Sequence, residues 1–128
     1  MKFQPDRIAS ANVIGGYTRH SVQVGERAWH ESLLLPWRGE VQPWTGARFE
    51  RLDASHFDAV AALQPELVLF GSGATLRFPR PEWLRALIER RIGFETMDTA
   101  AACRTYNLLV AEGRAVVAAL LIEPAGDL

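Results

Sequence analysis

The chain has 128 residues, of which 48% are hydrophobic and 23% are charged, and this balance predicts one globular domain over residues 1–128. Its formal net charge is −1, so the chain lacks the excess of basic residues with which nucleic-acid-binding proteins neutralise phosphates. We therefore expect no nucleic-acid partner. No apolar run approaches the roughly 20 residues that a membrane helix needs, and the N-terminus has no secretory signal; we therefore expect a cytoplasmic protein without membrane insertion.

Cysteine and histidine chemistry is sparse. Cys103 is the only cysteine, so no internal disulfide can form and no oxidising compartment is needed. His20, His30 and His56 do not have the spacing of metal ligands, and neither His-x₃-His nor Cys-x₂-Cys occurs. We expect no structural metal and no cofactor.

The first half of the chain is rich in strand signals. Residues 17–24 partly alternate between apolar and polar side chains, and residues 28–35 form a second strand pattern. Gly25-Glu26 lies between them as a turn, so the pair predicts a β-hairpin. Gly15-Gly16 predicts a further turn just before this hairpin.

A short helix and then an alternation of strands and helices follow. Residues 56–63 have apolar side chains at helical spacing, and Asp53 or Ser55 would cap this helix by accepting free backbone N–H groups. Beyond it we expect strand, helix, strand, helix and strand over residues 67–70, 82–92, 94–97, 99–112 and 115–122. The ends, 1–12 and 124–128, predict an irregular arm and a tail.

The order of these elements predicts the architecture. Each crossover is long enough to return a parallel strand, and such crossovers are right-handed in nearly all proteins. We expect a three-layer α/β domain in which a mixed central sheet carries the βαβαβ second half and an N-terminal β-hairpin forms an added layer. The helix over 82–92 should bury one apolar face, made by Trp83, Leu84, Leu87, Ile88 and Ile92.

Part of the second half resembles a known family. Residues 97–109, Met-Asp-Thr-Ala-Ala-Ala-Cys-Arg-Thr-Tyr-Asn-Leu-Leu, with Glu112-Gly113-Arg114 after them, resemble the signature of the Mth938-like domain family. Gly71-Ser72-Gly73 resembles its other landmark, where the family more often has Gly-Thr-Gly. The resemblance covers nearly the whole chain and implies a mixed-sheet α/β fold with a cleft between this glycine corner and Asp98-Thr99. The family includes mitochondrial complex I assembly factors, and the resemblance implies little chemistry because no catalytic activity is attached to the family.

The glycine corner has two interpretations. Gly71-Ser72-Gly73 follows a buried strand, which is where ligands bind in open α/β sheets, and two glycines let backbone N–H groups approach a small anion. The same glycines equally predict a tight turn that needs φ > 0. A dinucleotide fingerprint is incomplete, because position 76 is Leu and the next helix begins only near Pro81.

The second corner carries the other candidate site residues. Asp98 is either a helix N-cap or a functional carboxylate, and both hold if the cap lines the cleft. Arg104 would either bind a carboxylate or phosphate in fork geometry or form a structural ion pair. Cys103 shares a helical face with Asn107 and is either a buried inert thiol or a thiol activated near the start of the helix. We favour the inert thiol, because no histidine is placed beside it by the sequence.

Three tryptophans, Trp29, Trp37 and Trp44, gather in the first half. They predict either core beneath a loop, which we favour, or an exposed aromatic face that anchors a partner.

Two hypotheses about function follow, and whether the chain is an enzyme stays open. The first is a non-catalytic assembly module that binds a protein partner. The second is a site for a small anion or metabolite, or an enzyme, in the cleft made by Gly71, Ser72, Gly73, Asp98, Thr99 and Arg104. A homodimer is compatible with either.

Overall fold

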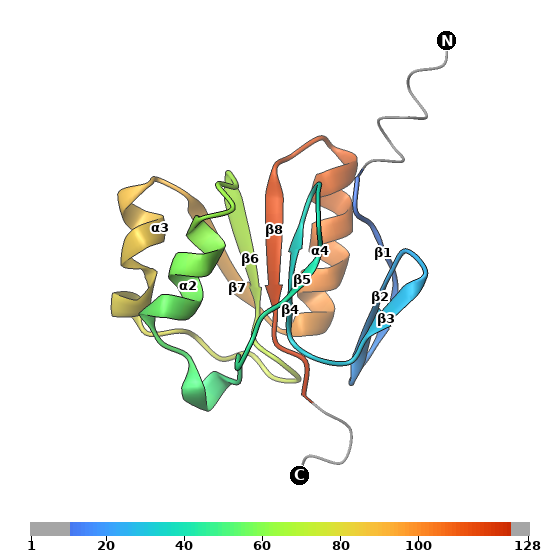
Figure 1. The fold of residues 1–128 in the computed structure, drawn as a ribbon, viewed down its shortest axis with the longest axis horizontal. Coiled ribbons are helices and arrows are strands. Elements are labelled where there is room, and N and C mark those ends of the chain that lie inside the picture. The colour runs from blue at the N-terminus through green and yellow to red at the C-terminus, as the bar shows by residue number, and fades with distance from the viewer. Residues whose placement is uncertain (1–10, 124–128) are drawn as a thin grey trace.

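The central element is a five-stranded mixed sheet (Figure 1). The computed structural model describes residues 11–123, so the predicted tail and most of the predicted arm lie outside the described residues. In spatial order the strands are β5 (Gln42–Pro43), β4 (Leu33–Pro36), β8 (Val116–Leu120), β6 (Leu67–Gly71) and β7 (Gly93–Met97). The last three run parallel and β4 is antiparallel to β8, which confirms the predicted mixed sheet and its βαβαβ half.

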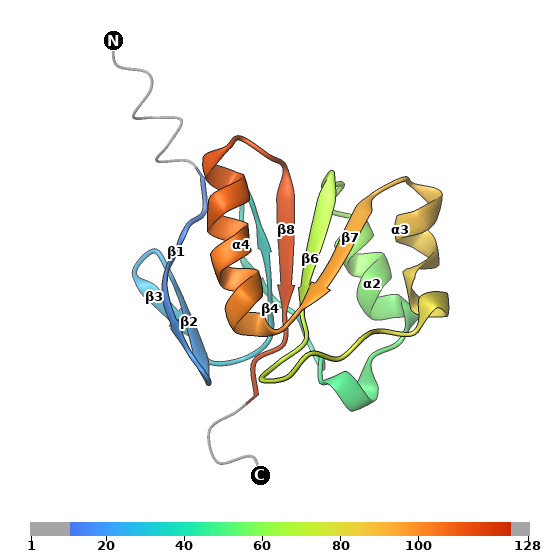
Figure 2. The ribbon, with the colours of Figure 1, turned by 180° about the vertical axis from the view of Figure 1, so that it is seen from behind.

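Helices cover both faces of this sheet (Figure 2). Helix α4 (Thr99–Ala111) lies on one face, and α2 (Ala54–Ala61) and α3 (Arg85–Glu89) lie on the other. Asp53 caps α2 by accepting from the backbone N–H of Ser55, so the first of the two caps considered is the one used. A short 3₁₀ turn, η1 (Phe49–Arg51), precedes α2.

A second, three-stranded antiparallel sheet forms the added layer. It contains β1 (Ile14–Thr18), β2 (Ser21–Val24) and β3 (Arg27–Trp29), and its apolar side chains pack with those of α4. The predicted N-terminal β layer is therefore confirmed, although its strands are divided differently.

Two features predicted in this region are wrong, the turn at Gly15-Gly16 and the undivided strand over 28–35. Gly15-Gly16 lies inside β1, where the pairing with β2 is irregular, and the chain turns instead at 19–20. The strand predicted over 28–35 splits at 30–32, because Trp29 pairs with β2 while Leu33 to Pro36 pair with β8 in the central sheet. Ser32 holds the break: its hydroxyl donates to the Ala47 carbonyl and accepts from the N–H of Ile122.

The helix predicted over 82–92 is shorter than expected. It consists of a 3₁₀ turn, η2 (Pro81–Leu84), followed by α3, and Arg91 has a positive φ of 58° beyond it. Leu87 is fully buried, but Ile88, which we predicted to face inward, is 66% exposed. Because the 3₁₀ turn advances fewer residues per turn than an α-helix, it rotates the face expected from α-helical spacing.

The core consists of two apolar clusters, one on each face of the sheet. One cluster joins α4 and the three-stranded sheet to the central sheet, and the other lies under α2 and α3. Strand β8 is buried along its whole length because it contributes to both clusters. This confirms the buried strand predicted over 115–122.

Candidate functional site

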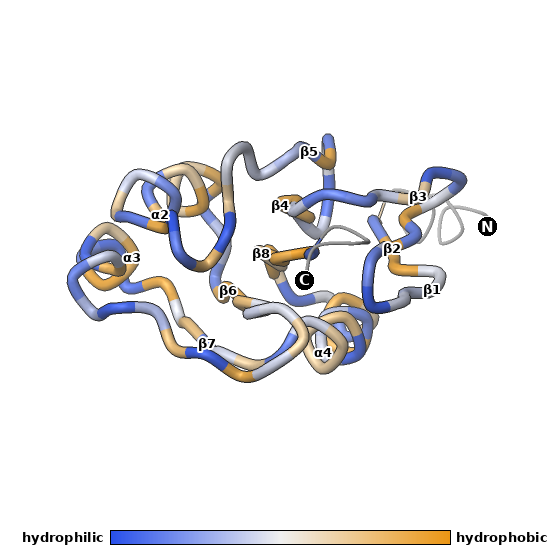
Figure 3. Tube along the Cα trace, turned by 90° about the horizontal axis from the view of Figure 1, so that it is seen from below, coloured by the Kyte–Doolittle hydropathy of each residue, from blue (hydrophilic) through white to orange (hydrophobic). Residues whose placement is uncertain are grey.

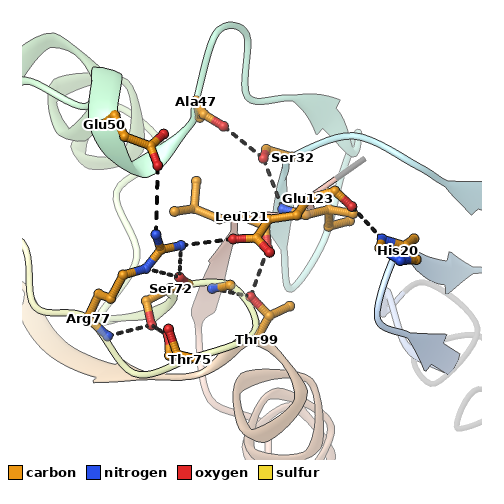
Figure 4. A network of polar contacts seen from close by, with 12 residues as sticks. His20, Ser32, Ala47, Glu50, Ser72, Thr75, Arg77, Thr99, Leu121 and Glu123 are labelled. Atoms are coloured by element: carbon orange, nitrogen blue, oxygen red, sulfur yellow. Dashed lines mark hydrogen bonds and ion pairs between the residues drawn. The ribbon is translucent and has the colours of Figure 1, made fainter. Parts of the chain in front are cut away.

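The two corners predicted to face each other are in direct contact (Figure 4). The backbone N–H of Gly73 donates to Thr99 Oγ1 at 2.9 Å, and the N–H of Thr99 donates to the Gly73 carbonyl at 2.9 Å. Thr99 Oγ1 in turn donates to the Leu121 carbonyl at 2.8 Å. The end of β6, the start of α4 and the segment after β8 are thus joined through one threonine hydroxyl.

Both glycines of the corner are required, Gly71 by packing and Gly73 by its backbone conformation. A Cβ on Gly71 would lie 2.9 Å from Leu120 Cδ2 and 3.0 Å from Thr99 Cα, so α4 could not approach β6 as closely. Gly73 has φ of +101°, and a Cβ there would lie 2.6 Å from Arg77 Nη2. The structural interpretation of this corner therefore accounts for both residues.

Ser72 is fully buried and closes the loop that follows β6. Its hydroxyl donates to the Thr75 carbonyl at 2.7 Å and accepts from the Arg77 N–H at 3.0 Å. Its carbonyl accepts from Arg77 Nε at 3.1 Å and Nη2 at 2.7 Å. The hydroxyl and the carbonyl of Ser72 are therefore both hydrogen-bonded to other residues of this loop.

Asp98 is the N-cap of α4, and it also lines a surface hollow. Its carboxylate accepts from the Ala101 N–H at 2.8 Å, as the cap interpretation predicts. The hollow, of about 320 Å³, lies between the start of α4 and the β1–β2 turn, where Tyr17 to Arg19 contribute to its wall. Of the six predicted site residues, Gly73, Asp98 and Thr99 line it, whereas Gly71, Ser72 and Arg104 do not.

Arg104 and Asn107 attach α4 to the three-stranded sheet. Arg104 is exposed, and its Nη1 donates to the Tyr17 hydroxyl at 2.8 Å; this hydrogen bond raises the pKa of the guanidinium. The Asn107 amide accepts from the Ile14 N–H at 2.9 Å and donates to the Ile14 carbonyl at 2.7 Å. Both side chains therefore hold β1 against the helix.

The thiol and the phenol of α4 are both buried. Burial raises the pKa of the Cys103 thiol to about 12, so the thiol stays protonated at neutral pH and is a weak nucleophile. Burial likewise raises the pKa of Tyr106, whose hydroxyl lies within hydrogen-bonding distance of the carbonyls of Asn12 (2.8 Å) and Pro36 (3.1 Å). This geometry fits the inert-thiol interpretation of Cys103.

Arg77 organises a second hollow that sequence reasoning missed. Besides the Ser72 carbonyl, its guanidinium contacts Glu123 at 3.1 Å and Glu50 at 3.9 Å and lies 4.6 Å from the centre of the Phe49 ring. The hollow, of about 450 Å³, has three arginines and two glutamates in its wall: Arg19, Arg48, Arg77, Glu50 and Glu123. No local signal marks this group, because its members come from four separate segments of the chain.

The tryptophans belong to the core, as we favoured. Trp29 and Trp44 are each 4% exposed, and Trp37 is half-buried against the cluster under α2 and α3. The Trp44 indole N–H donates to the His56 carbonyl at 3.1 Å. Within the described residues, the large apolar side chains that are exposed lie elsewhere: Val13, Tyr17, Leu76, Phe78, Ile88 and Leu108.

Residues 11–123 contain no cluster of three or more His, Cys, Asp or Glu side chains that could hold a metal ion. In the same range, no helix has both the length and the apolar character needed to cross a membrane.

Comparison with known proteins assigns the family. Residues 14–121 match the model of a family described as a protein of unknown function, DUF498/DUF598. The chain belongs to this family. A Bordetella parapertussis crystal structure shares 36% identity with a TM-score of 0.84, over 89% of this chain and 98% of that one. A Bordetella pertussis solution structure, described as a Mth938-like domain, shares 30% identity with a TM-score of 0.78, over 88% and 87% of the two chains. The predicted Mth938-like fold is confirmed.

Curated relatives of this family member include NADH dehydrogenase [ubiquinone] 1 alpha subcomplex assembly factor 3. The Bos taurus protein of that name is 34% identical over 111 residues, which are 85% of this chain and 59% of the relative. An uncharacterised Rhodobacter capsulatus protein is 39% identical over 103 residues, with 76% and 74% of the two chains covered. The chain thus spans just over half the length of the bovine assembly factor.

Proposed function

We propose that this chain is a non-catalytic assembly module that acts by binding a protein partner. The observation that carries the proposal is the internal use of the polar groups at the predicted site. Ser72, Asp98 and Thr99 each satisfy a backbone group of the fold, and the Cys103 thiol is buried and protonated. The two hydroxyls cannot also act as nucleophiles without breaking the corner, and a protonated thiol is a weak nucleophile.

The relatives support the same conclusion. Several are named as assembly factors of NADH dehydrogenase, and the matching segment covers most of this chain. Because this chain spans only part of their length, the transfer of an assembly role from them is a proposal about this chain. Its cytoplasmic location and a homodimeric state remain predictions.

Reconstitution tests the proposal. The tagged full chain, expressed at its native level in the source organism, should elute from gel filtration of a gentle lysate well above the 14.2 kDa of the free chain. The co-eluting protein should then rebind the purified chain from separate components. Elution of the chain as a free monomer under these conditions would contradict a partner-binding role.

The alternative is a site for a small anion or metabolite in the hollow beside Asp98. Its volume of about 320 Å³ lies at the lower end of the range for ligand sites, and Arg19 contributes a cation to its wall. This hollow stands at the carboxyl ends of the parallel strands, where open α/β sheets bind ligands.

A thermal-shift screen separates the two functions. A ligand at a hundred times its dissociation constant adds about 2.7 kcal/mol to the free energy of unfolding, which raises the midpoint of this domain by several degrees. The assembly function predicts no such shift with nucleotides, organic acids or inorganic anions. A shift that is lost in Arg19→Ala, whose side chain lines this hollow, would establish the small-molecule site instead.

A further inference from the structure

The two edges of the central sheet differ in how they are protected. Strand β5 has only two residues, one of which is Pro43, and proline has no N–H to offer a further strand. At the other edge, β7 has five residues and pairs on one side only, with β6. Figure 3 shows β7 at the margin of the sheet between α3 and α4.

The hydrogen bonds at both ends of β7 define which of its backbone groups face outward. The Gly93 N–H donates to the Glu66 carbonyl at 3.0 Å, and the Met97 carbonyl accepts from the Ser72 N–H at 2.9 Å. Successive residues of a strand direct their N–H and C=O groups to opposite sides. Residues 93, 95 and 97 therefore face β6, while Phe94 and Thr96 face the free edge.

The outward groups are without partners in the described part of the chain. No backbone or side-chain hydrogen bond joins the N–H or C=O of Phe94 or Thr96 to any residue from 11 to 123 outside the β6–β7 pair. Two donors and two acceptors thus form an open template for another strand. Helices α3 and α4 both contact β7, so the open edge lies between them.

The β1 edge of the three-stranded sheet shows what a covered edge looks like. On β1, the Asn107 amide pairs with both the N–H and the carbonyl of Ile14, as a neighbouring strand would. No comparable side chain from residues 11–123 reaches β7. The only device typical of protected edges there is one charge, the exposed carboxylate of Glu95, which has no ion pair with any described residue.

The charge of Glu95 indicates whether the strand that pairs with β7 comes from a second copy of this chain or from a different protein. Antiparallel self-pairing that uses all four outward groups must pair Phe94 with Thr96 of the other copy, which sets Glu95 opposite itself. Like charges directly opposite each other on neighbouring strands are destabilising, whereas a cation there is favourable. The edge is therefore complementary to a strand that carries a basic residue at the central position.

We propose that an extended segment of a partner protein adds to β7 as a sixth strand, with a lysine or arginine opposite Glu95. The proposal rests on the partner-binding function proposed above and names how the partner is held. Main-chain hydrogen bonds supply affinity in this mode, and alternate side chains supply specificity.

A synthetic peptide tests strand addition directly. The probe is a short, end-blocked peptide of alternating valine and threonine with lysine at its centre, and amide hydrogen exchange of the full chain is followed by NMR. At saturation we expect exchange at Phe94 and Thr96 to slow by about tenfold or more. A peptide with a central glutamate should bind about threefold to tenfold more weakly, and Glu95→Lys should reverse this preference. Protection that appears elsewhere, or nowhere, overturns the proposal.

Thr96→Pro is the decisive variant, because it removes an outward N–H and leaves every bond to β6 in place. We expect a folded chain, checked by its unchanged amide spectrum beyond β7, that no longer binds the lysine peptide. Wild-type binding by this variant would overturn strand addition. Dimerisation of the wild-type chain with the same two amides protected would also overturn it, since the occupant would then be a second copy.

The two proposals fail in different ways. If the wild-type chain recovers a partner from its source cells and Thr96→Pro recovers it equally well, strand addition is overturned while the assembly function stands. If the wild-type chain recovers no partner but the lysine peptide still protects Phe94 and Thr96, the assembly function is overturned and the docking edge stands.

Discussion

The glycine–threonine corner and the β7 edge differ in how fully their polar groups are satisfied. At the corner, the side-chain hydroxyls of Ser72 and Thr99 each donate one hydrogen bond and accept another within the chain. At β7, the backbone groups of Phe94 and Thr96 have none among the described residues. The polar side chains singled out by residue type are thus used within the fold, whereas the unpaired groups of this edge are backbone atoms, which residue type does not mark.

The largest expected effect is the difference in unfolding free energy between two proline substitutions at neighbouring positions of β7. Glu95→Pro removes an N–H that faces β6 and should cost about 3 kcal/mol or more of unfolding free energy. Thr96→Pro removes only an outward N–H and should cost well under about 1 kcal/mol. Urea denaturation of both variants checks this, and equal losses would show that the assignment of inward and outward residues is wrong.

Gly71→Val tests whether close packing between β6 and α4 requires a glycine at this position. A side chain there meets the α4 backbone at Thr99, so we expect a loss of about 3 kcal/mol and a fall of roughly 10 °C in the unfolding midpoint. Gly16→Ala is the matched control, because an added Cβ at Gly16 meets nothing within 4 Å. A Gly71 variant as stable as this control would contradict the close approach of α4.

Thr99→Val tests the corner as a hydrogen-bond junction. The substitution keeps the shape but leaves the Gly73 N–H and the Leu121 carbonyl without their partner, which should cost about 2 kcal/mol. Thr99→Ser retains the hydroxyl and should recover most of that loss. Thermal or urea unfolding of the pair provides the measurement, and equal stabilities would argue that water replaces the hydroxyl.

Asp98→Ala removes the N-cap of α4 and should cost about 1 kcal/mol. Asn is an equally good cap, so Asp98→Asn should remain close to the wild type in a denaturation experiment. If Asn were as harmful as Ala, the charge of Asp98 rather than its capping bond would be the important property.

The smallest effect concerns Glu66, at the opposite end of β6. Its hydrogen bond from Arg114, with a further one from the Ala115 N–H, lowers the pKa of its carboxyl. Because the folded-state pKa is the lower one, the stabilisation is present above the unfolded-state pKa of about 4.3 and is lost as the pH falls through the folded-state value. The stability difference between wild type and Glu66→Gln should therefore shrink in acid, whereas Glu82→Gln, a control without this partner, should show no such trend.

Local patterns predicted much of this molecule correctly. The buried run at 67–70, the cap at Asp98 and the helix from Thr99 all depend on contacts within a few residues, and the structure has each of them. The division of 28–35 between two sheets did not follow from its pattern, because alternation describes the exposure of a strand and not its partner. Likewise, Ile88 was predicted to face inward because the segment was treated as one continuous α-helix. It is exposed, since the segment begins with a 3₁₀ turn.

The sequence alone determined most strands and helices of the second half and the cap at Asp98. These elements follow from short-range periodicity and from the backbone conformations that glycine, proline and aspartate favour. The tertiary structure decided which of the candidate groups remain available. It used the hydroxyls of Ser72 and Thr99 internally, brought Arg77 to Glu123 from 46 residues away, and left the outer side of β7 unpaired. Satisfaction of a polar group is a property of its neighbours in space, which residue type and spacing do not specify.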